Sequence, residues 1–194
     1  MLDNLQKYHI ILASNSPRRK DLLSRLGIQF KTRTLLGIDE SYPSELEGED
    51  IVNFIAGVKA DAYADTMLPD ELIITADTIV LTPDGTVMGK PKTAEEAQMM
   101  LRKLSGMTHK VMTGFVVQTS KKRVAVSVVT KVTFAPLSEE EIAYYVESCL
   151  PFDKAGAYGI QEWIGMVAVE SIEGSYWNVM GLPVHQLYKV LKDF

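Results

Sequence analysis

Apolar and polar residues follow two different periods along the chain, and the two periods predict a mixture of strands and helices. Short apolar runs and period-two alternation indicate strands, whereas apolar positions that recur every three or four residues indicate helices. The expected strands cover residues 9–13, 28–34, 72–76, 111–118, 124–134 and 166–172. The expected helices cover residues 17–26, 49–67, 94–105, 139–147 and 183–191. Strands and helices do not alternate strictly, which favours an α/β fold with a mixed sheet flanked by helices.

Capping and turn residues set several of these boundaries. Ser16 is placed to cap a helix that has Pro17 at its first position, and Gly27 is placed to end it. Thr93–Glu96 and Ser138–Glu141 each have the spacing of a capping box, in which a hydroxyl and a carboxylate close the start of a helix. A hairpin turn is expected at Pro-Asp-Gly, residues 83–85.

Composition and charge narrow the function. A chain of 194 residues suits one compact domain, here taken as 1–194, and 46% hydrophobic residues is ordinary for a globular protein. The net charge of −5 argues against binding a nucleic-acid polymer, which needs a basic face. A single cysteine, no signal segment and no apolar run of about 18 residues predict a cytoplasmic protein that does not enter a membrane.

The segment from Ala13 to Arg19 is the strongest candidate for phosphate binding. A strand leads into a hydroxyl-rich turn and then into a helix start, where unpaired N–H groups attract anions. Arg18 and Arg19 stand in the first turn, where cations oppose the helix dipole, and a bound phosphate would reverse that cost. The alternative is that Ser16 is only an N-cap and that both arginines are only solvated.

Acidic residues provide a candidate for catalysis. Asp77 follows an apolar run and is expected at or near the end of its strand, where a carboxylate is costly unless it is paired or bound to a metal. It is read either as a metal ligand or general base, or as a turn aspartate. Glu40 and Asp39 lie in a loop that could face Asp77, and such oxygen ligands suit Mg²⁺ or Mn²⁺.

Two lysines and one amide complete the candidate set. Lys90, in Gly89-Lys90-Pro91, is a credible positive charge for a triphosphate, although the proline excludes a Walker loop. Lys59 lies beside the apolar stripe of its helix and could either snorkel to solvent or reach a phosphate. Gln161 ends a loop of small residues, and its amide offers both a donor and an acceptor to the edge of a base.

Taken together, these segments resemble the Maf family of nucleoside triphosphate pyrophosphatases. The matching segments are residues 12–19, 76–78, 89–91, 153–161 and 178–183. The form Asp-Lys-Ala-Gly-Ala-Tyr-Gly-Ile-Gln at 153–161 resembles the subgroup that acts on dTTP and UTP. The resemblance implies a mixed twisted sheet in two lobes with a central cleft, as in inosine triphosphatase-like proteins, and it implies a homodimer.

The resemblance also assigns roles to single residues. It implies that Asp77 is the catalytic proton acceptor and that Arg18, Thr78 and Gln161 set substrate specificity. The other polar active-site positions that it implies are Glu40, Lys59 and Lys90. Ser14, Arg19 and Lys154 are assigned to substrate binding, and Glu40 and Asp77 to a divalent metal. Gly57 departs from the usual family sequence around Lys59.

The reaction implied is hydrolysis of a pyrimidine nucleoside triphosphate to the monophosphate and pyrophosphate. A water activated by Asp77 or by Mg²⁺ or Mn²⁺ would attack the α-phosphorus. A non-catalytic nucleotide sensor in cell-division control is the alternative, but a sensor has no need of Asp77 as a base. A phosphotransferase is a third possibility, for which the sequence offers no acceptor site.

Overall fold

The computed structural model describes residues 2–194, which form a mixed sheet with helices on both of its faces. The strands are β1 (His9–Leu12), β2 (Lys31–Thr32), β3 (Glu71–Leu81), β4 (Val87–Met88), β5 (Thr108–Gln118), β6 (Arg123–Phe134) and β7 (Val169–Glu173). The helices are α1 (Pro17–Arg25), α2 (Glu49–Asp61), α3 (Ala94–Leu104), α4 (Glu139–Cys149), α5 (Trp163–Val167), α6 (Tyr176–Val179) and α7 (Val184–Lys192), with 3-10 turns η1 (Asp3–Leu5) and η2 (Ala155–Ala157). No helix among these residues is long and apolar enough to cross a membrane.

The sheet combines parallel and antiparallel pairs. Its strand order is β2-β1-β3-β5-β6-β7, and β4 pairs with β3 off this path. β1 runs parallel to both β2 and β3, whereas β4 is antiparallel to β3 and β7 is antiparallel to β6. The mixed α/β sheet predicted from the sequence is therefore confirmed, and so is the hairpin at residues 83–85, which joins β3 to β4.

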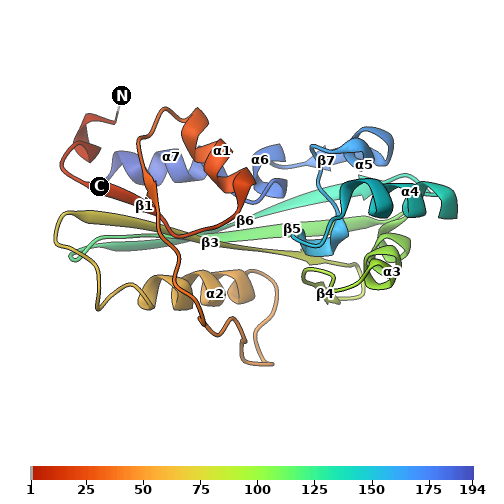
Figure 1. Ribbon diagram of the computed structural model, residues 1–194, viewed down its shortest axis with the longest axis horizontal. Coiled ribbons are helices and arrows are strands. Elements are labelled where there is room, and N and C mark those ends of the chain that lie inside the picture. The colour runs from red at the N-terminus through yellow and green to blue at the C-terminus, as the bar shows by residue number, and fades with distance from the viewer. Residues whose placement is uncertain (1) are drawn as a thin grey trace. The chain divides into compact units, whose positions relative to one another are not determined.

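The chain divides into two compact units, and β3, β5 and β6 contribute residues to both. Unit 1 comprises residues 1–77, 113–128 and 181–194, and unit 2 comprises residues 78–112 and 129–180. Within unit 1, α1 and α7 cover one face of the strands and α2 covers the other (Figure 1). The expectations of one domain over 1–194 and of a central cleft between two lobes stay predictions.

In unit 1, α2 packs closely on the sheet because small residues face each other. Ala56 and Ala60 form a buried cluster with Val116 of β5. A side chain at Gly114 of β5 would lie 2.6 Å from the carbonyl oxygen of Val52, so only glycine lets the backbone of α2 come this near. This approach fixes which residues of α2 face the strands.

In unit 2, a buried aromatic cluster joins β5, β6 and the segment after η2. His109 Nε2 and the Tyr158 hydroxyl share a hydrogen bond of 2.8 Å, and Phe134 packs edge-on against both rings. Burial lowers the pKa of His109 to about 4 and raises the pKa of Tyr158. Both groups are therefore neutral near pH 7.

Helix caps agree closely with the sequence. Ser16 caps α1 by accepting from the Arg19 N–H, and Ser138 with Glu141 forms the complete capping box of α4. Thr93 caps α3, but the Glu96 carboxylate accepts from the Lys92 N–H at 2.7 Å, one residue before the N-cap.

Four elements differ most from the prediction, and the position of Asp77 is the most important of these differences. Strand β3 extends to Leu81, so Asp77 lies in the middle of an eleven-residue strand and not at or near its end. Apolar residues resume at Ile79 and Val80, and the strand continues there to pair with β4 through Val80 and Met88. The polar pair at residues 77–78 therefore does not end this strand, and the predicted strand end is wrong.

The remaining differences concern lengths and one short helix. Strand β2 covers only residues 31–32 of the expected 28–34. Helix α2 ends at Asp61, after which residues 62–66 form turns held by hydrogen bonds such as Tyr63 N–H to Ala60. The expected strand 166–172 is wrong at its start, because residues 166 and 167 belong to α5, where Gly165 lies against the Ile160 carbonyl oxygen. The strand itself, β7, begins at Val169.

Candidate active site

Strand alternation turns Asp77 toward α2. Residues 73, 75 and 77 of β3 share one face of the sheet, because side chains alternate along a strand. Ile73 packs on Tyr63, and the Thr75 hydroxyl donates to the Ala56 carbonyl oxygen at 2.7 Å. Asp77 is the next residue on this face, so it meets the residue that α2 presents between Ala56 and Tyr63.

That residue is Lys59, whose ammonium group bridges two carboxylates. Lys59 Nζ lies 2.8 Å from Asp77 Oδ1 and 3.0 Å from Glu40 Oε2. The side chains of Lys59 and Asp77 are each only 14% exposed, whereas Glu40 is 53% exposed. Lys59 therefore reaches inward and does not snorkel to solvent, and its ammonium contacts both Asp77 and the loop residue Glu40.

Asp39 does not take part in this cluster. Its Oδ1 accepts from the Ser41 N–H at 2.9 Å, and this hydrogen bond lowers the pKa of Asp39. Asp39 is therefore a turn residue of the loop, and Glu40 is the residue that this loop brings to Lys59.

The start of α1 adds two arginines to the same unit. The Arg19 guanidinium donates from Nε to the Gly181 carbonyl oxygen at 2.7 Å and from Nη1 to the Ala76 carbonyl oxygen at 2.8 Å. Burial lowers the pKa of Arg19, and the negative charge of Asp77 partly offsets that effect. Arg19 thus ties α1 to β3 one residue before Asp77.

The balance of charge in this cluster suits an anion. Arg18, Arg19 and Lys59 bring three positive charges, whereas Asp77 and Glu40 bring two negative charges. Arg18 and Glu40 both lie near enough to shift the pKa of Arg19, in opposite directions. An excess of positive charge beside a helix start favours phosphate binding.

Ser14 and Thr78 lie next to these charged residues in the chain. Ser14 is buried, and its hydroxyl accepts from the Ser16 N–H at 3.2 Å, so it shapes the turn that leads into α1. Thr78 directly follows Asp77 on β3 and is half-buried, on the opposite face of the strand. Thr78 belongs to unit 2, whereas Ser14 belongs to unit 1.

Unit 2 holds Lys90 on a constrained turn. The Gly89 carbonyl oxygen accepts from the Gly156 N–H at 3.0 Å, while Lys90 itself is exposed. Gly156 has a φ of 68°, and a side chain there would lie 2.8 Å from Val80, so this position requires glycine. The loop with Lys90 is thereby joined to the loop with Lys154.

Lys154 is buried among acidic groups. Its Nζ lies 2.7 Å from Asp153 Oδ1 and 3.1 Å from Glu162 Oε1, and its side chain is only 8% exposed. The second oxygen of Glu162 accepts a hydrogen bond from the Tyr145 hydroxyl. Burial raises the pKa of Tyr145, and the hydrogen bond to Glu162 raises it further, so Tyr145 stays a donor.

Gln161 directly precedes Glu162, and its side chain is exposed. It belongs to the same unit as Thr78, Lys90 and Lys154, whereas Ser14, Arg18, Arg19, Glu40, Lys59 and Asp77 belong to unit 1. Sequence reasoning missed Tyr145 and Glu162, because a tyrosine on an apolar helix face and an acidic residue in a loop carry no signal of their own.

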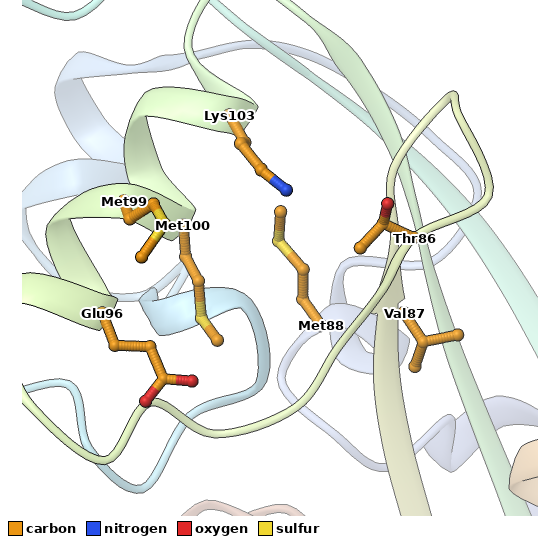
Figure 2. A pocket seen from close by; sticks show the side chains of 7 residues that line it. All are labelled: Thr86, Val87, Met88, Glu96, Met99, Met100 and Lys103. Atoms are coloured by element: carbon orange, nitrogen blue, oxygen red, sulfur yellow. The ribbon is translucent and has the colours of Figure 1, made fainter.

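Two other features of unit 2 lie outside the candidate set. Burial raises the pKa of the Cys149 thiol, which disfavours the thiolate and supports a packing role. A pocket of about 150 Å³ lies between β4 and α3, and its lining includes the methionines Met88, Met99 and Met100 (Figure 2). None of the candidate residues lines this pocket.

The sheet and its helices define a known fold. Over 96% of this chain, the structure is similar to that of a HAM1 protein from Coxiella burnetii, with a TM-score of 0.51, 14% identical residues and full coverage of that chain. At this level of identity the similarity concerns the fold alone. It agrees with the inosine triphosphatase-like sheet expected from the sequence.

Sequence comparison is more specific than the fold. Residues 9–194 match the family described as Maf-like protein. A relative from Phocaeicola vulgatus is 60% identical over 99% of both chains, and one from Parabacteroides distasonis is 57% identical over the whole of both. A relative from Flavobacterium johnsoniae is 47% identical over 97% of this chain and 96% of its own. All three are named dTTP/UTP pyrophosphatase.

The chain belongs to the Maf family. The resemblance inferred from its five short segments is thus confirmed over nearly the whole chain.

Proposed function

We propose that this protein hydrolyses dTTP and UTP to the nucleoside monophosphate and pyrophosphate. Relatives that match it over their whole length carry the name dTTP/UTP pyrophosphatase. The structural observation that carries the proposal is the contact of Lys59 with both Asp77 and Glu40 beside the start of α1. This arrangement places a candidate base next to cations that suit a polyphosphate.

In the proposed reaction, Asp77 accepts a proton from the water that attacks the α-phosphorus. The new bond joins the water oxygen to that phosphorus, and the bond between the phosphorus and the pyrophosphate oxygen breaks. Lys59 holds Oδ1 of Asp77 in place, and Lys59 and Arg18 of unit 1 balance the negative charge of the phosphates. The family resemblance gives Lys90 of unit 2 the same role. Arg19 contributes by fixing α1 against β3 at Ala76.

The donor atoms of Asp77 and Glu40 fit a divalent metal. Lys59 contacts one oxygen of each carboxylate, Oδ1 and Oε2, so each carboxylate has a second oxygen for a metal. No group of three or more acidic, histidine or cysteine side chains in residues 2–194 makes a complete protein site. Mg²⁺ commonly takes one or two carboxylates and completes its shell with phosphates and water. Bound there, Mg²⁺ or Mn²⁺ would neutralise charge that develops on the phosphate.

We assign base recognition to Gln161, with Thr78 and Arg18 as further specificity residues and Ser14 as a substrate-binding residue. The Gln161 side chain is exposed, and its amide can pair with the O4 and N3–H edge of uracil or thymine. A purine presents a different edge and leaves such a polar group unpaired, which penalises the wrong base. A homodimer and a cytoplasmic location are further proposals that rest on the resemblance.

Product analysis tests the proposed function. The protein is incubated with dTTP, UTP or GTP in the presence of Mg²⁺ or Mn²⁺, and the products are separated by anion-exchange chromatography. We expect dTMP or UMP together with pyrophosphate, and slower turnover of GTP. Diphosphate with inorganic phosphate would indicate cleavage at the γ-phosphate, and binding without turnover would favour a nucleotide sensor.

A further inference from the structure

A hydrogen-bonded chain within unit 2 connects Lys154 to the backbone of the segment that carries Gln161. The Lys154 ammonium contacts Oε1 of Glu162 at 3.1 Å, and the Tyr145 hydroxyl donates to Oε2 of the same carboxylate. The Tyr145 oxygen in turn accepts from the Gly159 N–H at 2.9 Å. Both oxygens of Glu162 are therefore engaged, and the backbone of Gly159 is held two residues before Gln161.

Tight packing restrains the same segment from both sides. A side chain at Gly159 would lie 2.8 Å from Cδ of Glu162 and 2.9 Å from Nε2 of Gln161, so the Glu162 carboxylate and the Gln161 amide fill the space beside Gly159. A side chain at Gly165 would lie 1.8 Å from the Ile160 carbonyl oxygen, so the middle of α5 lies against the backbone of Ile160 and requires glycine. Gln161 thus has an exposed side chain on a backbone that is fixed before and after it.

The Lys154 charge is already compensated inside this network. Its side chain is 8% exposed and contacts two carboxylates, those of Asp153 and Glu162. Removing one partner of a buried ion pair is costly, because the other charge is left without compensation. Lys154 therefore supports Glu162 more directly than it could support a phosphate.

We propose that Glu162 and Tyr145 are positioning residues that fix Gln161 for recognition of the pyrimidine base. This role rests on the proposed function, because it presumes that Gln161 selects the base. Glu162 acts through the backbone on either side of Gln161, and Tyr145 links that backbone to α4. Lys154 acts in the same way, as the cation that holds the Glu162 carboxylate.

Two conservative substitutions break this network in different places. Glu162→Gln keeps the shape but replaces one acceptor oxygen by a donor NH₂, so the amide can accept from Lys154 or from Tyr145 but not from both. Tyr145→Phe keeps the ring and its packing but leaves the buried Gly159 N–H without an acceptor. Each change loosens residues 159–162 and leaves the Gln161 side chain itself intact.

Substrate selectivity in a double-mutant cycle tests the proposal. The ratio of kcat/KM for dTTP to kcat/KM for GTP is measured for wild type, Glu162→Gln, Tyr145→Phe, Gln161→Ala and the two double variants with Gln161→Ala. Glu147→Gln and Tyr144→Phe are matched controls, because both residues are exposed on α4, outside the network. Hydrogen exchange of the Gly159 amide is measured in parallel.

We expect each network substitution to lower the dTTP-to-GTP ratio by about tenfold, as the loss of one well-placed hydrogen bond does. On the Gln161→Ala background the same substitutions should leave the ratio unchanged, and exchange at Gly159 should accelerate in both single variants. A ratio that does not fall in the folded single variants overturns the proposal, as does an equal fall on both backgrounds.

Two further outcomes are distinguished by the design. If Glu162→Gln does not fold, Tyr145→Phe carries the test, because it preserves the aromatic ring and every charge. If wild type itself does not hydrolyse dTTP or UTP, the proposed function fails and the positioning role fails with it. Turnover by wild type with unchanged selectivity in the variants overturns the positioning role alone.

Discussion

Buried His109 predicts a specific loss of stability in mild acid. Burial lowers the pKa of His109 from 6.5 to about 4, so between these pH values the unfolded chain binds a proton that the folded chain does not. The contribution of neutral His109 to the free energy of unfolding is therefore fully present above about pH 6.5, and it is lost as the pH decreases toward about 4. One proton costs about 1.4 kcal/mol per pH unit, which gives a total loss of about 3 kcal/mol.

The substitution His109→Gln isolates this contribution. Glutamine does not titrate, and its amide can still form a hydrogen bond with the Tyr158 hydroxyl, which His109 contacts at 2.8 Å. His185→Gln is the matched control, because His185 is exposed on α7. Carboxylates that titrate in the same range are common to all three proteins, so their contribution cancels in the comparison.

Urea unfolding measured from about pH 7 to about pH 5 provides the assay. Wild type and His185→Gln should lose about 2 kcal/mol more than His109→Gln over this interval, because the variant lacks the titrating group. Equal pH dependence in wild type and His109→Gln would refute the reasoning. So would direct titration of His109 in the folded protein near its ordinary pKa.

Three further predictions concern the proposed reaction. Asp77→Asn should fold normally and lose about 10²–10⁴-fold in kcat, since a general base contributes that much, and Asp65→Asn should keep full activity in the same steady-state assay. Lys90→Ala should lower kcat/KM for dTTP at least about tenfold with little change in Tm. Lys92→Ala is the control and should keep wild-type kinetics. Wild-type kinetics in Lys90→Ala would show that Lys90 does not bind the substrate. Gln161→Ala should raise the transition-state free energy for dTTP and UTP by about 1–3 kcal/mol and so lower kcat/KM for both. An unchanged ratio of kcat/KM for dTTP to that for GTP would mean that the shape of the site, and not Gln161, selects the base.

Much of the fold could be predicted because local signals and tertiary packing agree. Ser16 with Pro17 and Ser138 with Glu141 mark helix starts that the structure reproduces, since their hydrogen bonds lie within one turn. The strand end at Asp77 was predicted wrongly, because whether a polar residue ends a strand depends on partners outside the strand. Here that partner is Lys59, eighteen residues earlier in the chain.

The candidate site was predictable to a similar extent. The helical period placed Lys59 beside the buried face of α2, but the sequence left open whether its ammonium reaches solvent or the interior. Because β3 continues through Asp77, the alternation of the strand directs the Asp77 side chain toward α2, and the Lys59 ammonium meets it in the interior. Glu162 and Tyr145 had no such signal, because their importance comes from contacts with Lys154 and Gly159 that only the folded chain creates.

Hydrolysis of dTTP in water enriched in ¹⁸O, followed by mass spectrometry of the products, tests the central claim most directly. Attack on the α-phosphorus places the water oxygen in the monophosphate, so the account predicts one ¹⁸O atom in dTMP and none in pyrophosphate. Label in pyrophosphate would indicate attack on the β-phosphorus. Label in inorganic phosphate, with dTDP as the second product, would show cleavage at the γ-phosphate, and either result would contradict the account.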